Sequence, residues 1–234
     1  MTAPVPFKPL RAGFTLLELL SAVMIVAILA GLLYPVGSSA IRKGHAAKCT
    51  ANLRQIGVAL HAYAGENNNY YPKLSDGLGK DWDQSAIAPY LPNRADGRQS
   101  KVFICPAAKY KGWPTGDLSR TYMAADSLKG LGATGQPLDS YTEAARNRGM
   151  IANSSSSVLL IDAVQSGNQR FCELVKNWSQ VSSTSDLVAG GTGTTSAIDY
   201  RHDGAVQALC ADGHVTVISR KDPSFISEKA WKGL

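Results

Sequence analysis

The sequence predicts an α+β protein in which one long N-terminal helix packs on an antiparallel β-sheet. Three observations lead to this fold class. Helical periodicity extends well beyond an apolar N-terminal run, short apolar segments alternate with Gly-, Ser- and Thr-rich stretches in the second half, and Asp212-Gly213 separates two apolar runs. We therefore expect a helical stem followed by a loop-rich head, which suits a chain of 234 residues.

The N-terminal helix begins with an uncharged segment of twenty-three residues, Leu19 to Ile41. About 20 apolar residues are enough for a helix to cross a bilayer. Lys8 and Arg11 precede the segment, and positive charge on this side predicts a cytoplasmic N-terminus. Glu18 is the unusual residue, because a carboxylate at the edge of an apolar segment is costly and usually serves a purpose.

Helical spacing continues past Pro35, where a kink or local melting is expected because proline lacks a backbone donor. The Gly-Glu-Asn-Asn-Asn stretch from Gly65 should end the helix. The pattern predicts one helix from about residue 14 to about 65, roughly 75 Å long at 1.5 Å per residue. Its second half carries an apolar stripe that can cover a sheet, formed by Ile41, Leu53, Ile56, Leu60 and Tyr63.

Short segments in the head predict its remaining elements. WDQSAIAPYL, residues 82–91, predicts a short helix, and KVFIC, SSVLLID and RFCELV predict strands because they are apolar or β-branched. Asp212-Gly213 predicts a hairpin with strands at about 205–211 and 214–218, and with both turn residues at positive φ. The periodicity of residues 106–200 is otherwise too poor to predict a fold.

The hexapeptide GFTLLE, Gly13 to Glu18, closely resembles the processing site of type IV prepilins and type II secretion pseudopilins. The resemblance implies cleavage after Gly13 by a membrane peptidase and N-methylation of Phe14. It also implies that Glu18 neutralises the N-terminal ammonium of a neighbouring subunit during filament assembly, and that Pro35 kinks the helix. From the residues alone, Glu18 could instead reach its own amine, or mark the membrane interface and extend to water.

The resemblance divides the chain into a leader, 1–13, a transmembrane and filament-core helix, 14–36, an amphipathic continuation, 37–65, and a periplasmic head, 66–234. It implies a single-pass inner-membrane protein whose partners are other copies of itself, related pseudopilins, the membrane and the prepilin peptidase and methyltransferase. A type II secretion role is favoured over a pilus, because the head lacks the C-terminal cysteine pair enclosing a loop that many adhesive pilins have.

The spacing of the four cysteines leaves their pairing open. Residues 49–72 and 102–106, however, resemble a subgroup of pilin-like proteins abundant in planctomycetes and verrucomicrobia. That resemblance implies a disulfide between Cys49 and Cys105 that covalently links the long helix to the head.

The C-terminal region resembles the same subgroup through a His-x9-Asp-Gly signature formed by His202, Asp212 and Gly213. The family associates this signature with prepilin processing. A purely structural interpretation is that Asp212-Gly213 is a turn and that His202 caps or hydrogen-bonds a loop. Because an extended strand separates His202 from His214, the two histidines are not expected to form one cluster.

No catalytic motif appears, so we expect no enzymatic activity, no catalytic residue and no cofactor. The net charge of +6 is spread along the chain without a basic run, which does not indicate nucleic-acid binding. A calcium site remains an option, since carboxylate oxygens are the ligands that calcium prefers. The candidate ligands are Asp162, Asp199 and Asp203.

Three other interpretations remain. The chain could be a membrane-anchored periplasmic enzyme or a carbohydrate-binding protein on a pilin-like anchor, a plain signal-anchored protein, or a secreted domain behind a cleaved signal peptide. An aromatic sugar platform would be needed for carbohydrate binding, although such residues are also commonly buried in a core. The candidates are Trp82, Trp113, Trp178, Tyr70 and Tyr71.

Overall fold

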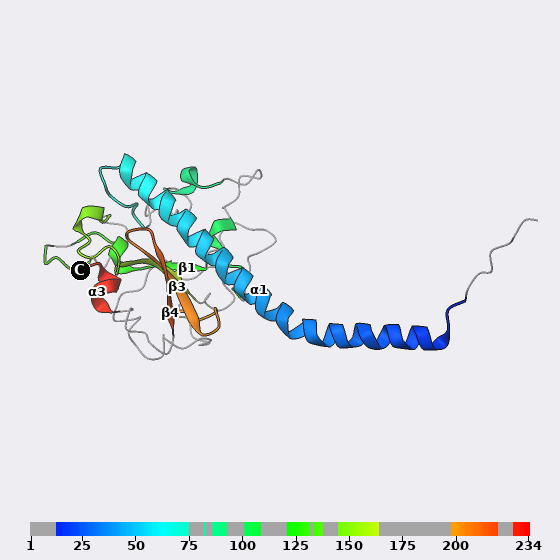
Figure 1. Ribbon diagram of the computed structural model, residues 1–234. Coiled ribbons are helices and arrows are strands. Elements are labelled where there is room, and N and C mark those ends of the chain that lie inside the picture. Colours follow the sequence, from blue (N-terminus) through cyan, green and yellow to red (C-terminus); the bar gives the residue numbers. More distant parts are fainter. Residues whose placement is uncertain are drawn as a thin grey trace, which may run out of the picture. The chain divides into compact units, whose positions relative to one another are not determined.

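The computed structural model describes residues 13–74, 82, 86–92, 101–108, 121–131, 133–137, 145–163, 198–219 and 227–234, with the side chains of 33–36 and 228 left out. Within these residues a long helix is followed by a four-stranded antiparallel sheet (Figure 1). The predicted α+β fold class is confirmed. The chain forms two compact units, Met1–Ile41 and Arg42–Leu234, and the described residues of the first unit belong mostly to the N-terminal part of the helix.

Helix α1 spans Leu16–Glu66, a length of 51 residues, close to the predicted limits. It ends where Asn68 and Asn69 adopt positive φ angles of 52° and 65°, which Asn tolerates better than most residues. The helix continues through position 35 without a break, so the local melting considered there does not occur. The side chain of Pro35 and the leader, 1–12, lie outside the described residues, and the kink stays a prediction.

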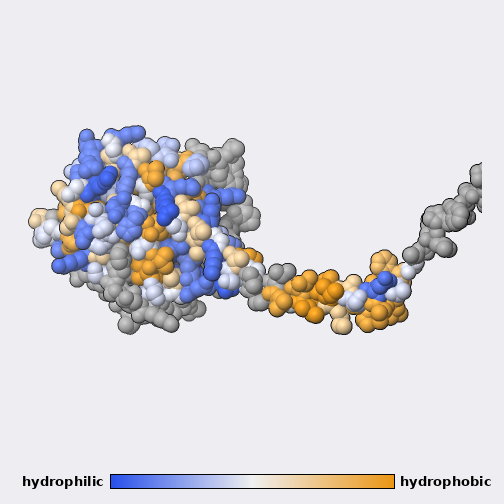
Figure 2. All heavy atoms as spheres, in the orientation of Figure 1, coloured by the Kyte–Doolittle hydropathy of each residue, from blue (hydrophilic) through white to orange (hydrophobic). Residues whose placement is uncertain are grey.

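The first part of α1 exposes apolar side chains all round. Leu16 is 83% exposed and Leu32 is 67% exposed, and the residues between them show the same pattern. Figure 2 shows this part of the helix covered by apolar residues. By length and composition, α1 is able to cross a membrane. A surface of this kind requires lipid or other apolar helices around it.

The second part of α1 packs on the head through the predicted apolar stripe. Leu53, Ile56 and Leu60 are fully buried, whereas Arg54 is exposed. Gly57 permits the close approach, because a Cβ atom there would come within 2.9 Å of Leu209 Cδ1 on the sheet. The stripe begins with Cys49.

The prediction that Ile41 belongs to the apolar stripe was wrong. Ile41 is 61% exposed, since it belongs to the first compact unit and the head covers the helix only further along. Helical spacing alone places Ile41 on a face but cannot say how far the sheet extends under that face.

The sheet has the order β1-β2-β3-β4, and every neighbouring pair is antiparallel. The strands are β1 Tyr122–Ala124, β2 Val158–Asp162, β3 Ala205–Cys210 and β4 Val215–Ser219. The strand predicted from SSVLLID is therefore confirmed as β2, and the C-terminal hairpin as β3 and β4. The sequence did not predict β1, which has only three residues.

Two predicted elements differ in the structure. KVFIC does not form a strand: Lys101–Phe103 is a 3-10 helix, with Val102 and Phe103 buried. The predicted helix at 82–91 is limited to a 3-10 turn at Ala88–Tyr90 among its described residues. Both segments place apolar side chains in the core without joining the sheet, so their apolar composition alone was misleading. RFCELV, residues 171–176, lies outside the described residues.

Alternation along β3 divides the core into two layers. Leu209 packs on the α1 side with Leu160, whereas Val206 and Ala208 face the opposite side. There they meet Trp231 of the short helix α3, Glu228–Lys232. Helix α1 and helix α3 thus enclose the sheet from its two faces (Figure 1). The remaining 3-10 turns are Asp126–Leu128 and Arg148–Met150.

Candidate functional site

The predicted processing site lies on an irregular segment before α1. Residues 13–15 have no regular secondary structure, and Phe14 is 89% exposed. A Cβ atom added at Gly13 would have no other heavy atom within 4 Å, so no neighbouring group packs against the backbone at this position. The Gly13–Phe14 peptide bond is therefore accessible to a peptidase.

Glu18 closes the N-terminal end of α1. Its Oε2 atom accepts hydrogen bonds from Thr15 N at 2.9 Å and from Thr15 Oγ1 at 2.8 Å. In return, Glu18 N donates to Thr15 Oγ1 at 3.2 Å. This reciprocal pair is a capping box, in which Thr and Glu satisfy donors that the first helical turn leaves free. The Glu18 carboxylate is thereby held beside the residue that follows Phe14.

The capping role of Glu18 was not among the roles predicted from the sequence. The signal was present, because Thr15-x-x-Glu18 directly precedes an apolar run and matches the capping-box pattern. The cap gives Glu18 a structural role that does not need a second subunit.

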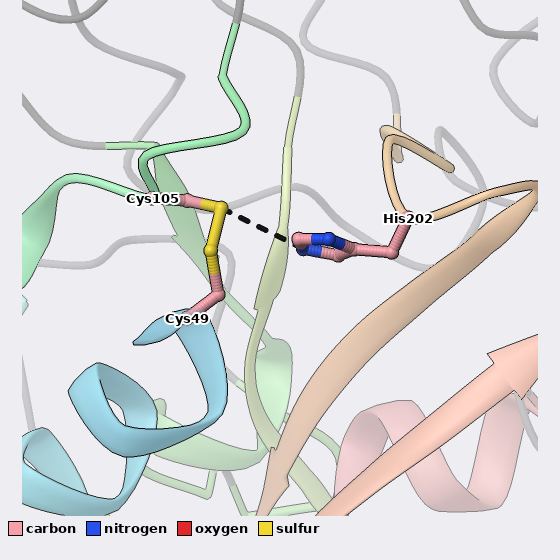
Figure 3. A group of neighbouring side chains, drawn as sticks. All are labelled: Cys49, Cys105 and His202. Carbon is pink, nitrogen blue, oxygen red and sulfur yellow. Dashed lines mark hydrogen bonds between the residues drawn. A yellow bond between two sulfur atoms is a disulfide. The ribbon is translucent and has the colours of Figure 1, made fainter. Parts of the chain in front are cut away.

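A second group of candidate residues surrounds a disulfide between α1 and the head (Figure 3). Cys49 on α1 and Cys105, which follows the 3-10 turn at 101–103, are joined by a disulfide. This is the pairing that the resemblance implied. Both residues are fully buried, and His202 Nε2 lies 3.6 Å from Cys105 Sγ. The disulfide covalently ties the buried half of α1 to the head.

Asp162, at the end of β2, lies behind His202 and is completely buried. Its Oδ2 accepts a hydrogen bond from Gln207 N at 2.9 Å and lies 3.3 Å from His202 Nε2. Its Oδ1 is 4.0 Å from Arg201 Nε, which is paired more closely with Asp199 at 2.9 Å. This network could not be predicted from the sequence, because residues about 40 positions apart form it.

Two of the three calcium candidates are neighbours, because Asp199 N donates to the backbone carbonyl oxygen of Asp162 at 3.1 Å. Asp162 and Asp199 face Arg201, and Asp203 pairs with Arg42 on α1 at 3.1 Å. Each carboxylate thus has a basic side chain as its neighbour, and calcium binding stays a prediction.

The Asp212-Gly213 turn differs from the prediction in type. Cys210 N donates to His214 O and Gly213 N donates to Cys210 O, both at 2.9 Å, so the hairpin loop has three residues rather than two. Gly213 adopts a positive φ of 93°, whereas Asp212 does not adopt one. A three-residue loop needs left-handed backbone only at its last position.

The signature residues occupy opposite ends of the hairpin, as predicted. Asp212 Oδ1 accepts hydrogen bonds from His214 N at 3.1 Å and from His214 Nδ1 at 2.6 Å. His202 bridges to Ala205 at the start of β3. The three signature residues therefore belong to two separate sites: His202 contacts the disulfide, and Asp212 and Gly213 form the turn.

His61 of α1 connects the helix to this turn. Its Nε2 lies 3.0 Å from the carbonyl oxygen of Ala211, and a Cβ atom at Gly213 would lie 3.3 Å from His61 Cε1. Glycine therefore provides both the positive φ and the space for His61. Burial, followed by the charge of Arg148, lowers the pKa of His61, although the Ala211 carbonyl and Asp212 act in the opposite direction.

We expect the head to lose stability as the pH falls through about 6.5, the ordinary pKa of histidine. The folded state holds His61 with a lowered pKa, so the unfolded state binds more protons in this range and acid favours unfolding. The stability that neutral His61 contributes is complete above that pH. Chemical denaturation between pH 8 and 5 should show a shallower decline for His61→Gln than for the wild-type chain, and equal slopes would contradict the assignment.

The aromatic residues considered as a sugar platform are partly core residues. Trp82 and Tyr71 are 2% and 1% exposed, and Trp82 packs edge-on against Phe103. Tyr70 is exposed, while Trp113 and Trp178 lie outside the described residues. Burial of Trp82 and Tyr71 favours the packing interpretation for these two.

Comparison with known proteins agrees with the N-terminal geometry. Residues 8–34 match the family described as the prokaryotic N-terminal methylation motif. No curated protein and no solved structure matches the chain. The matched segment contains the accessible Gly13–Phe14 bond, the Glu18 cap and the exposed apolar part of α1. The chain thus carries a prepilin-type N-terminal methylation motif on an apolar helix, as expected of a type IV pilin-like protein.

Proposed function

We propose that the protein is a structural subunit, a pseudopilin or pilin, of a type II secretion or type IV pilus-like filament. A prepilin peptidase cleaves after Gly13, a methyltransferase modifies Phe14, and α1 packs with other copies of the chain and with related subunits. The protein is anchored in the inner membrane by a single helix with its head in the periplasm, and it catalyses no reaction.

The observation that carries this proposal is the methylation motif on a helix whose first part is apolar all round. A soluble core helix would bury one face, and this part of α1 leaves its large apolar side chains exposed. In a membrane these side chains face lipid, and in a filament they face the same helix of neighbouring subunits.

Glu18 is the residue that makes assembly specific. Cleavage creates an ammonium at Phe14, and a charge in an apolar bundle is tolerated when it is paired. The Glu18 carboxylate already hydrogen-bonds to Thr15, one residue from Phe14, so it faces the end of the helix where the ammonium forms. An incoming subunit's ammonium can bind the same carboxylate and thereby fix the axial register between two helices.

The Glu18→Gln variant separates assembly from helix capping. Glutamine can take the same place as glutamate in a capping box, but it cannot neutralise an ammonium. We expect this variant to be processed to a Phe14 N-terminus while its recovery in filaments falls by at least about tenfold, because an unpaired buried charge costs several kcal/mol. The measurements are the intact mass of the membrane-purified chain and its amount in sheared filaments, both with prepilin peptidase present.

Glu18→Asp is the matched control, since it keeps the charge on a shorter side chain and should retain part of the assembly. A wild-type chain that still begins at Met1 or Thr2 beside a competent peptidase would contradict the whole proposal. Normal incorporation of Glu18→Gln would show instead that Glu18 serves only as the helix cap.

Between the two kinds of filament, we favour type II secretion. Among the described cysteines, Cys210 is buried and unpaired, and burial raises the pKa of its thiol to about 12. Many adhesive pilins have a C-terminal loop closed by a cysteine pair. In such a loop Cys210 would be disulfide-bonded, whereas here it is a free thiol. Loss of a secreted protein from the medium upon deletion of the chain, with surface adhesion unchanged, would support this choice.

A further inference from the structure

We propose that Cys49, Cys105 and His202 form a binding site for a thiophilic divalent cation of the zinc class when the disulfide is reduced. This inference goes beyond the proposed filament function and does not depend on it. The site would hold the same two parts of the protein that the disulfide joins, namely α1 and the head.

The ligand atoms of the three side chains lie close together. The two sulfur atoms and a ring nitrogen of His202 all lie within 4.8 Å of one another (Figure 3). The separation of Cys105 Sγ and His202 Nε2, 3.6 Å, equals the spacing of about 3.6 Å between a sulfur and a nitrogen on one tetrahedral zinc ion. Metal binding requires the two sulfurs to move apart, to about 3.8 Å, which rotation of the cysteine side chains can supply.

The buried carboxylate of Asp162 lies beside the histidine. Asp162 Oδ2 lies 3.3 Å from the same Nε2 atom that faces Cys105, close to the spacing of about 3.3 Å expected for nitrogen and oxygen on one ion. Its other oxygen, Oδ1, is buried and accepts no hydrogen bond. A small shift would let Asp162 complete a set of two sulfurs, one nitrogen and one oxygen, the donor types that zinc prefers.

The charges around the site are compatible with a divalent ion. Two thiolates and Asp162 supply three negative charges where the disulfide form has one. Arg201 is the nearby cation, at 4.0 Å from Asp162 Oδ1, and Asp199 at 2.9 Å already balances it. His202 and Asp162 are nearly or fully shielded from water, so the site is dry and its ligands are held by the surrounding chain.

The ion can bind after the disulfide has been reduced. A protein dithiol in the same compartment as the head exchanges with the Cys49–Cys105 bond: two electrons and two protons pass to this bond, which yields two thiols, and the protein dithiol becomes a disulfide. The divalent ion then binds both sulfurs, and the two thiol protons are released. In the reverse direction a protein disulfide accepts two electrons from the two thiolates and two protons from water and becomes a dithiol, the Cys49–Cys105 bond forms again, and the ion leaves. The connection between α1 and the head would thus be covalent in oxidising conditions and metal-mediated in reducing conditions.

Cobalt is the probe for this site, because cobalt bound to thiolates absorbs light through sulfur-to-metal charge transfer. We would use the full chain in detergent with Cys172→Ala and Cys210→Ala, so that only two thiols remain. A phosphine and one water per disulfide give the two thiols and a phosphine oxide. We expect one cobalt per chain, charge-transfer absorption, release of two protons per metal, and displacement by zinc. The oxidised chain should give no such absorption.

The role of the histidine is tested by a matched pair of variants. His202→Ala should weaken cobalt binding at least about tenfold, a loss typical of changes at metal sites, whereas His214→Ala in the same hairpin should bind as the parent does. Circular dichroism of each reduced chain follows folding. Absence of charge-transfer absorption would overturn the proposal, as would equal affinities in the two variants. Binding by an unfolded reduced chain would not depend on His202 and would count against the site.

Discussion

Replacing Cys49 and Cys105 with alanine is expected to lower the free energy of unfolding of the head by about 4 kcal/mol. The disulfide closes a loop with a sequence separation of 56, and closing a loop of this length restricts the unfolded chain by about that amount. The other contacts of the helix with the head near Cys49 are non-covalent and remain in the variant: Thr50 Oγ1 donates to Gln207 Oε1 at 3.1 Å, and Asn52 Nδ2 donates to the carbonyl oxygen of Ile104 at 3.0 Å. The measurement is chemical denaturation of the full chain in mild detergent, followed by tryptophan fluorescence.

Reduction of the wild-type chain provides the control for this result. With a chelator present to exclude metals, the reduced wild type should fall to about the stability of the double variant, and the variant itself should not respond to reductant. Equal stabilities of the oxidised wild type and the variant would show that packing of α1, rather than the disulfide, holds the helix to the sheet.

Replacing Asp162 with alanine should lower the free energy of unfolding by about 1–3 kcal/mol, the cost of leaving a buried hydrogen-bond donor without its acceptor. Asp162 is completely buried and serves Gln207 N, His202 and Arg201. Alanine would leave a backbone N–H without its acceptor and Arg201 with Asp199 as its remaining carboxylate. Denaturation under the same conditions measures the loss.

Two further variants identify the source of this loss. Asp162→Asn keeps an acceptor for Gln207 N but removes the charge, so it should cost less than Asp162→Ala. Asp203→Asn removes the partner of Arg42 in an exposed ion pair and should change stability by no more than about 1 kcal/mol. If Asp162→Ala behaves like Asp203→Asn, the buried network does not stabilise the head.

The N-terminal part of the protein could be predicted from the sequence because the determinants are local. The apolar run sets the length of a helix that is able to span a membrane, and GFTLLE places the processing residues at its start. The same holds for the C-terminal hairpin, since Asp212-Gly213 between two apolar runs indicates a turn whatever surrounds it. Even there, the length of the loop depended on hydrogen bonds of Cys210, His214 and Gly213.

The middle of the head could not be predicted, because its segments are short and packed on several sides. KVFIC and the residues of β1 are similarly apolar, yet one forms a 3-10 turn and the other a strand. What separates them is their neighbours: β1 pairs with β2, whereas the segment at 101–103 precedes a cysteine that is bound to α1. A pattern within one segment carries no information about such partners.

The helix, its apolar first part, the methylation motif and the hairpin can be predicted from the amino-acid sequence, since each depends on residues that are neighbours along the chain. The contacts of His202 and Asp162 instead arise from the fold of the head. These two residues come from segments about 40 residues apart and meet beside a disulfide that joins two further segments. Burial of charge and sulfur there depends on the packing of α1, β2 and β3 together, and no single stretch of sequence encodes that contact.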